Sequence, residues 1–124
     1  MSISSKVKEQ VKFLYDFSIL LEYIKNYKGV VATIGEGWRT QYQQEEYYRK
    51  GLTKTLNSLH KERLAIDLNF YDYNTGKYFD NNIESKKILQ EIGDFWESLD
   101  PKNKWGGNYK SFLDIPHFER RTNV

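Results

Sequence analysis

The segment from Leu64 to Tyr71 constrains the fold of this chain more than any other. Its apolar side chains alternate with smaller or polar ones, as in a strand with one buried face; the apolar positions are Leu64, Ile66, Leu68 and Phe70. The opposite face carries Asp67 between Ala65 and Asn69. Because an unpaired carboxylate inside a sheet is costly, that face must be open or line a cleft where water, a cation or hydrogen-bond donors meet Asp67.

The remaining periodicity predicts helices and short strands around this segment. A helix is predicted over residues 5–27, with a buried face made of Val7, Val11, Leu14, Phe17, Leu21 and Ile24. Further helices are predicted over residues 41–50 and 83–99, and short strands over residues 30–34, 77–79 and 115–119. Thr40 would cap the second helix and Gly51 would end it. This order predicts an α+β fold, a small antiparallel sheet packed by about three helices.

Composition limits the classes of protein to which the chain can belong. Its 124 residues suit a single domain, 1–124, and a formal net charge of +2 is too small to predict nucleic-acid binding. The chain has no cysteine, which excludes disulfides, a thiolate nucleophile and a cysteine metal site. Its ten Tyr, seven Phe and three Trp would fill a core or line a groove for a sugar or peptide, and composition favours the core.

The sequence also bears on where the chain acts. The sequence contains no run of roughly eighteen apolar residues, so it predicts no insertion in a membrane. The N-terminal residues lack the apolar region and the cleavage site of a signal peptide. We therefore expect a chain made in the cytoplasm without a signal peptide. Nothing in the sequence indicates an obligate dimer, so we expect a monomer.

Two histidines are the natural partners of Asp67. His60 precedes the strand in the run SLHKERLAID, and His117 lies in the last predicted strand. Two imidazoles and one carboxylate form a three-ligand zinc set that leaves the fourth position for water. Such an ion lowers the pKa of its water to about 7. The alternative is that both histidines are ordinary surface residues, since the helical spacing HExxH is absent.

Acidic residues near His117 are candidates for proton transfer. A hydrolytic zinc site needs a carboxylate that takes the proton of the water and passes it to the leaving amine. Asp114 stands just before His117, with Pro116 stiffening the link, and is the first candidate; a turn-capping role is its alternative. Glu119 would share a strand face with His117, as a rival base or as a support for that histidine.

Together these motifs resemble a known family. SLHKERLAID followed by WGGNYKSFLDIPHFE is similar to the zinc D,D- and L,D-peptidases of bacterial cell-wall metabolism. These include vancomycin-resistance-type carboxypeptidases and phage endolysins that cleave L-alanyl-D-glutamate. The shared pattern is Ser-x-His, Ala-x-Asp and Asp/Glu-x-x-His, here Ser58, His60, Ala65, Asp67, Asp114 and His117. The run GWRT resembles the family's glycine–aromatic–arginine element, so the resemblance covers the chain from about Gly35 to Glu119.

The resemblance implies roles for individual residues. The implied ligands of a Zn²⁺ cofactor, in a cleft on the sheet, are His60, Asp67 and His117. Asp114 would be the general base. Arg39 would stabilise the oxyanion or bind a substrate carboxylate, work that suits its fixed fork of donors. Ser58 would support the site, and Trp105 would shape the cleft wall, although a packing role suits this tryptophan equally well.

The resemblance also implies a substrate, the peptide stem of peptidoglycan, which the enzyme would meet in the periplasm. An aspartate base followed by Pro-His-Phe is more typical of the endolysin branch, so a phage endolysin that cuts L-alanyl-D-glutamate is the first prediction. A D-alanyl-D-alanine carboxypeptidase or dipeptidase is the alternative within enzymes. A zinc-containing domain that binds without hydrolysis is the alternative outside them.

Two further features stand apart from the pattern. Arg63 occupies a position where the family commonly has glycine, which puts the geometry of this loop and the substrate preference in question. Asp72 and Asp80 flank a predicted turn. They would bind calcium or, as is commoner, belong to a solvated turn.

Overall fold

The computed structural model describes residues 2–53, 55 and 57–122, so the ends of the predicted domain 1–124 lie outside the description. The helices are α1 (Ser5–Lys25), α2 (Gln41–Arg49) and α3 (Ile83–Ser98). The strands are β1 (Val30–Ile34), β2 (Ala65–Asp72), β3 (Asn103–Trp105) and β4 (His117–Arg120), and a short 3-10 helix, η1 (Gly106–Asn108), follows β3. The strands pair antiparallel in the order β1-β2-β4-β3, which confirms the predicted α+β fold.

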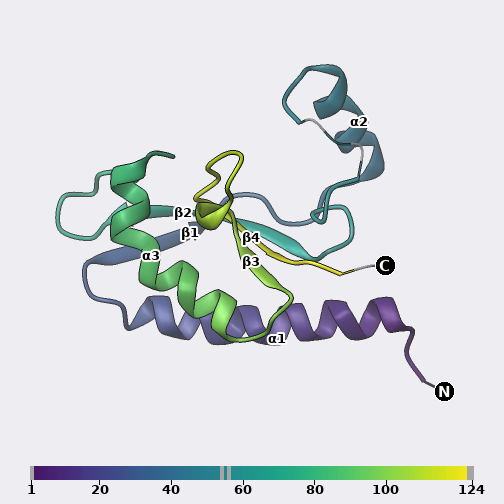
Figure 1. Cartoon of the computed structure of the whole chain (residues 1–124), viewed down its shortest axis with the longest axis horizontal. Coiled ribbons are helices and arrows are strands. Elements are labelled where there is room, and N and C mark those ends of the chain that lie inside the picture. Colours follow the sequence, from purple (N-terminus) through teal and green to yellow (C-terminus); the bar gives the residue numbers. More distant parts are fainter. Residues whose placement is uncertain (1, 54, 56, 123–124) are drawn as a thin grey trace.

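The core lies between the sheet and the two longer helices. α1 and α3 pack on each other and on the sheet, whereas α2 stands apart at one end of the molecule (Figure 1). The fully buried core residues include Leu20, Leu68, Leu89, Ile92, Trp96 and Phe118. Successive side chains of a strand point to opposite faces, so Asp67 and His117, the neighbours of Leu68 and Phe118, face away from this core.

The buried face of α1 differs from the predicted one. The predicted Phe17 and Ile24 are buried, but their buried apolar neighbours are Phe13 and Leu20, whereas Val7, Leu14 and Leu21 of the predicted face are exposed. Both sets satisfy helical spacing, so periodicity could not choose between them. The buried carboxylate of Asp16 accepts a hydrogen bond from the Asn103 side chain, a partner that only the folded chain brings near.

The short strands also depart from prediction. The strand predicted over residues 77–79 is reduced to a single bridge between Tyr71 and Tyr78. β3 was not predicted, because three residues with one partner strand leave almost no periodic signal. The capping predictions for the second helix hold better: the Thr40 side chain accepts from the Gln43 N–H at 3.0 Å, and Gly51 has the positive φ of 75°.

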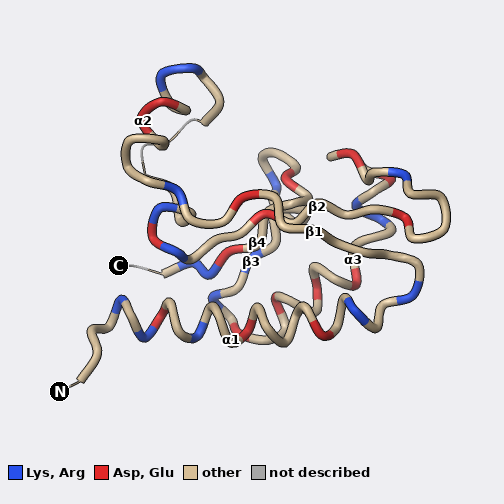
Figure 2. Tube along the Cα trace, turned by 180° about the vertical axis from the view of Figure 1, so that it is seen from behind, with Lys and Arg blue, Asp and Glu red and all other residues tan. Residues whose placement is uncertain are grey.

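Ion pairs join α1 to the end of β4. Glu9 accepts hydrogen bonds from the Arg120 Nε at 2.5 Å and from the Lys102 Nζ at 2.9 Å. Arg120 also meets Asp100 at 3.1 Å. Figure 2 shows acidic and basic residues interspersed along α1.

Among the described residues, no helix combines the length and apolar character that crossing a membrane requires.

Candidate metal centre and active site

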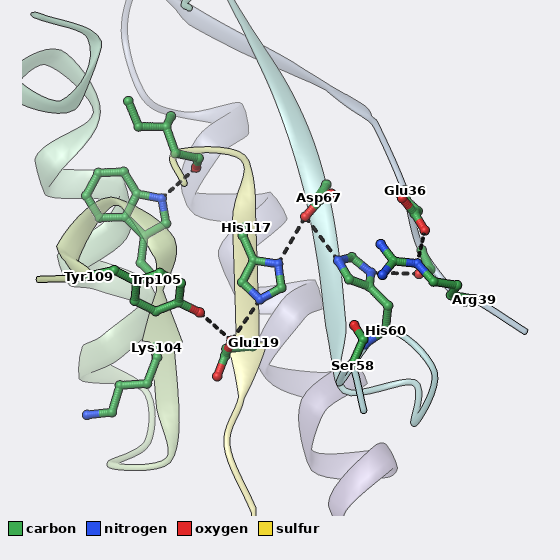
Figure 3. Close-up of polar contacts among 12 residues, drawn as sticks. Glu36, Arg39, Ser58, His60, Asp67, Lys104, Trp105, Tyr109, His117 and Glu119 are labelled. Carbon is green, nitrogen blue, oxygen red and sulfur yellow. Dashed lines mark hydrogen bonds and ion pairs between the residues drawn. The ribbon is translucent and has the colours of Figure 1, made fainter. Parts of the chain in front are cut away.

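The three predicted ligands converge on the open face of the sheet. Asp67 of β2 and His117 of β4 are direct partners in the strand register. His60 reaches them from the loop before β2, and its side chain is 4% exposed. One candidate ligand atom from each residue lies within 4.8 Å of the others, and the two imidazoles flank the carboxylate (Figure 3).

The backbone fixes which nitrogen of His60 faces the cluster. Its Nδ1 lies 2.9 Å from the carbonyl oxygen of Gly37, which can only accept, so Nδ1 carries the proton and donates. The other nitrogen, Nε2, lies 3.3 Å from Asp67 Oδ1. His60 therefore points an unprotonated nitrogen at Asp67 when its ring is neutral.

A carboxylate fixes His117 in the same way. Its Nε2 lies 2.8 Å from Glu119 Oε1, so this nitrogen carries a proton and donates to the carboxylate. Its Nδ1 lies 3.2 Å from Asp67 Oδ1. Burial opposes charge on His117, but the hydrogen bonds to Asp67 and Glu119 outweigh it and raise the pKa of this imidazole to about 9.

This arrangement calls for a cation between the three side chains. With both imidazoles neutral, two nitrogen lone pairs face the same carboxylate oxygen, and only a proton or a metal ion relieves their repulsion. Zinc bonds of about 2.0–2.1 Å at tetrahedral angles place neighbouring ligand atoms about 3.3–3.4 Å apart. The nitrogen atoms of His60 and His117 lie 3.3 and 3.2 Å from Asp67 Oδ1, close to this spacing. Partners for the second nitrogen of each ring, here Gly37 and Glu119, are typical of metal-binding histidines. The residues present therefore fit a zinc ion.

Asp114 is held beside this cluster by close backbone contacts. The His117 N–H donates to the Asp114 carbonyl at 3.1 Å, and the Asp114 N–H donates to the Gly106 carbonyl at 3.0 Å. A Cβ at residue 106 would lie 2.0 Å from the Asp114 carbonyl oxygen, so only glycine allows this approach. Burial raises the pKa of the Asp114 carboxyl, which suits a group that must both take and return a proton.

Arg39 lines the same cavity and is firmly anchored. Its Nε donates to Glu36 Oε1 at 2.5 Å and its Nη1 donates to Gln44 Oε1 at 2.8 Å. Its guanidinium lies 4.8 Å from the centre of the Tyr47 ring. The Arg39 N–H also donates to the His60 carbonyl at 3.2 Å. These anchors on Glu36 and Gln44 were not predicted, although both residues lie within five positions of Arg39 in the sequence.

The cavity that holds these residues has a volume of about 1150 Å³. Its walls come from two sides, with Tyr47 and Leu52 of the α2 region opposite Tyr109 and Phe112 of the loop after η1. All three candidate ligands, Asp114 and Arg39 line it. The cavity is therefore large enough for a peptide beside the candidate metal centre.

Comparison with known proteins identifies the family of the chain. A family model described as D-alanyl-D-alanine carboxypeptidase matches residues 51–120, the stretch that contains the candidate ligands and Asp114. The chain belongs to this zinc D,D-/L,D-peptidase family. The peptidoglycan L-alanyl-D-glutamate endopeptidase CwlK of Bacillus subtilis (strain 168) is 31% identical over 105 residues, which is 74% of this chain. The chain spans 62% of the length of that relative.

A solved peptidase has the same fold. The L-Ala D-Glu endopeptidase ChiX of Serratia marcescens superposes with a TM-score of 0.63, covering 97% of this chain and 90% of the other. The two chains share 21% sequence identity, so this likeness is evidence for the fold.

Ser58 and Trp105 occupy different environments in this member of the family. Ser58 lines the cavity, and its Oγ accepts from the His60 N–H at 3.2 Å. Trp105 does not shape the cleft wall: it is fully buried, and its indole N–H donates to the Ile115 carbonyl at 2.8 Å. A Cβ added at Gly93 or at Gly107 would lie 1.9 or 2.3 Å from its ring. The packing alternative is therefore the one that the structure supports.

The arginine at the family's usual glycine position adopts a glycine-like backbone. Arg63 has a φ of 59°, the left-handed region that side chains rarely enter. Its guanidinium lies 4.5 Å from the centre of the Trp38 ring, a cation–π contact that offsets part of this strain. The loop between His60 and β2 thus keeps its turn despite the substitution.

The side chain of Asp72 stabilises the turn that follows it, and the structure gives no sign of a calcium site among the residues that it describes there. Its Oδ1 accepts from the Asn74 N–H at 2.8 Å and the Thr75 N–H at 2.9 Å. Within the described residues, the side chains close enough to share a metal ion are those of the cluster around Asp67, and no such group lies at this turn.

Proposed function

We propose that this chain is a zinc-dependent peptidase that hydrolyses the L-alanyl-D-glutamate bond in the peptide stem of peptidoglycan. The observation that carries the proposal is the pair of imidazole nitrogens that face one oxygen of Asp67, at 3.2 and 3.3 Å, inside a large cavity. Family membership supports peptide hydrolysis, and the activity for which CwlK is named supports the choice of bond.

The chain's own residues account for proton transfer and charge stabilisation. A zinc ion held by His60, Asp67 and His117 would supply Lewis acidity toward the amide carbonyl and the attacking water. Asp114 takes the proton of that water and returns it to the leaving amine. Arg39 directs its remaining donors at the negative charge that develops on the carbonyl oxygen. Its anchors on Glu36 and Gln44 hold it in place beforehand, so little reorganisation is needed.

A D-alanyl-D-alanine carboxypeptidase is the second candidate, and the description of the matching family model favours it. Both reactions use the same metal centre and base, so the difference lies in how the cavity seats the stem. Purified muropeptides treated with the chain and analysed by mass spectrometry separate the two. Release of free D-alanine would identify the carboxypeptidase, whereas stems cut after L-alanine would identify the endopeptidase.

A murein zymogram tests hydrolysis itself. We expect a cleared band that disappears with a chelator and returns with added zinc. A chain that binds zinc and murein but clears nothing would instead be the non-catalytic binding domain. Clearing that persists after complete removal of metal would contradict the zinc proposal.

The biological setting is a further part of the proposal. A monomeric single domain acting on the thin wall of a Gram-negative host would suit a phage endolysin. Added to cells with a permeabilised outer membrane, such a chain lowers their turbidity, and light scattering reports its oligomeric state. Intact murein stems after this treatment would contradict the endolysin role.

A further inference from the structure

Glu119 is the most heavily engaged carboxylate on the open face of the sheet. It lies two residues beyond His117 on β4 and is 5% exposed. Three donors converge on it: the His117 Nε2–H at 2.8 Å, the Arg121 Nε–H at 2.9 Å and the Tyr109 hydroxyl. Because an ionised carboxylate only accepts hydrogen bonds, all three groups donate to Glu119.

These contacts leave Glu119 poorly suited to act as the base. Its Oε1 accepts from both His117 and Tyr109, and its Oε2 is held by Arg121. With its lone pairs engaged in this way, the carboxylate is a support for the histidine, and Asp114 remains the candidate for proton transfer.

Tyr109 contacts Glu119 from a separate segment of the chain. It follows η1 and lines the cavity, where its ring packs edge-on against Phe112 at 5.2 Å. Its hydroxyl shares Glu119 Oε1 with the imidazole of His117, as the chain of contacts in Figure 3 shows. The position of Oε1 therefore depends on this hydroxyl as well as on the histidine.

We propose that Tyr109 is a positioning residue that acts through Glu119 on His117. Its hydroxyl holds Glu119 Oε1 where it accepts the Nε2–H, which keeps the opposite nitrogen, Nδ1, aimed at Asp67. Outer partners of this kind orient metal-binding histidines. The inference rests on the proposed metal centre and adds to it a residue that sequence reasoning did not identify.

The variant Tyr109→Phe tests this role because it removes the hydroxyl and keeps the ring against Phe112. Loss of an outer partner lowers metal affinity by about 10–100-fold, and we expect an effect near the lower end because Arg121 still holds Glu119. Zinc affinity is measured by competition with a chelating dye. Tyr78→Phe is the matched control, since it removes a hydroxyl that lies 3.5 Å from Asn69 on the same face, outside the cavity.

A readout without metal separates this inference from the proposed function. In the metal-free protein, NMR follows exchange of the His117 Nε2 proton with water, and we expect faster exchange in Tyr109→Phe than in wild type or Tyr78→Phe. Wild-type protein that binds no zinc would end the proposed function, yet this exchange measurement would still test the positioning role.

Two results with Tyr109→Phe would overturn the positioning role. Unchanged zinc affinity and proton exchange with lost hydrolysis would make Tyr109 a substrate contact instead. Unchanged zinc affinity, exchange and hydrolysis would show that the hydroxyl does nothing at this site.

In a second pair of variants, Glu119→Gln keeps an acceptor oxygen for His117 and should retain zinc better than Glu119→Ala. Equal loss in both would also contradict positioning through this hydrogen bond.

Discussion

At the scale of single residues, the site is built from side chains whose hydrogen-bond partners leave few choices. Gly37 fixes the proton of His60 on one nitrogen, and Glu119 fixes that of His117. Both rings then turn their other nitrogen to Asp67. The spacing of the sequence motif predicted these residues, but the atoms that face one another are a property of the folded chain.

Asp114→Asn tests the base. The amide cannot take a proton, so we expect the turnover number to fall by about 10²–10⁴-fold while zinc stays bound. Burial raises the pKa of Asp114, so the base becomes protonated at a higher pH than an ordinary aspartate would. As the pH is lowered, the loss of wild-type activity should therefore begin earlier. Turnover of muropeptides and zinc content are the measurements. Near wild-type turnover with zinc retained would transfer the role to another group.

Replacement of Arg63 tests the strain in its loop. The left-handed conformation costs a side-chain-bearing residue about 1–2 kcal/mol, and glycine avoids this cost. Arg63→Ala keeps the strain and loses the contact with Trp38, worth about 0.5–1 kcal/mol at such a site. We therefore expect Arg63→Gly to have a free energy of unfolding about 1 kcal/mol above that of Arg63→Ala, measured with urea. An alanine variant as stable as the glycine variant would show that the loop carries no strain.

At the scale of elements, the position of the candidate metal ligands depends on how β4 is held. β4 pairs with β2 through Asp67 and His117, and its far end is tied to α1 by Arg120. Trp105 of β3 packs under the same strand, against Phe118. The site is therefore supported by segments from both ends of the chain.

Glu9→Gln tests the tie between α1 and β4. Hydrogen bonds from Lys102 and Arg120 lower the pKa of Glu9 in spite of its partial burial. The stabilisation is fully present above 4.5, the ordinary pKa of a glutamate, and is lost as the pH falls through the lower pKa of Glu9 in the folded state. We expect the variant to lose about 1 kcal/mol at pH 7 and the difference to shrink toward pH 3. Denaturation at several pH values measures this.

Glu46→Gln is the matched control for this prediction. It removes the carboxylate of an exposed pair with Arg49 on α2, far from β4, and should leave stability nearly unchanged. A loss from Glu9→Gln that stayed constant across the pH range would contradict the linkage argument.

At the scale of the whole molecule, the candidate ligands join separate parts of the fold. His60 lies in the loop after α2, Asp67 in the inner strand β2 and His117 in β4, near the C-terminal end of the chain. An ion bound by all three favours the folded state, because the unfolded chain does not keep these side chains together.

Zinc should therefore raise the melting temperature of the chain. At a concentration about a hundredfold above the Kd, the ion stabilises the fold by about 2.7 kcal/mol. Scanning calorimetry with zinc and with chelator measures the shift. Asp67→Ala removes the candidate ligand that faces both histidines and should abolish the shift in melting temperature, whereas Tyr78→Phe should leave this shift intact. An equal shift in Asp67→Ala would place the zinc somewhere else.

The sequence by itself predicted the three helices, most of the strands and the candidate residues of the site. Alternation from Leu64 to Tyr71 predicted the strand that carries Asp67, since one buried face imposes a period of two. Helical spacing of apolar residues predicted α1 and α3, and the capping residue Thr40 with Gly51 as a stop predicted α2. The presence of only two histidines made His60 and His117 the candidate partners of Asp67, and the resemblance to the zinc peptidases implied their role as ligands.

Only the tertiary structure decided which face of α1 is buried, where Trp105 lies and what holds His117. Two apolar stripes of α1 satisfy the same period, and the one with Phe13 and Leu20 is buried because it packs against residues far away in the sequence. Tyr109 meets Glu119 only after the loop beyond η1 folds back onto β4. Such contacts depend on long-range packing and leave no local pattern in the chain.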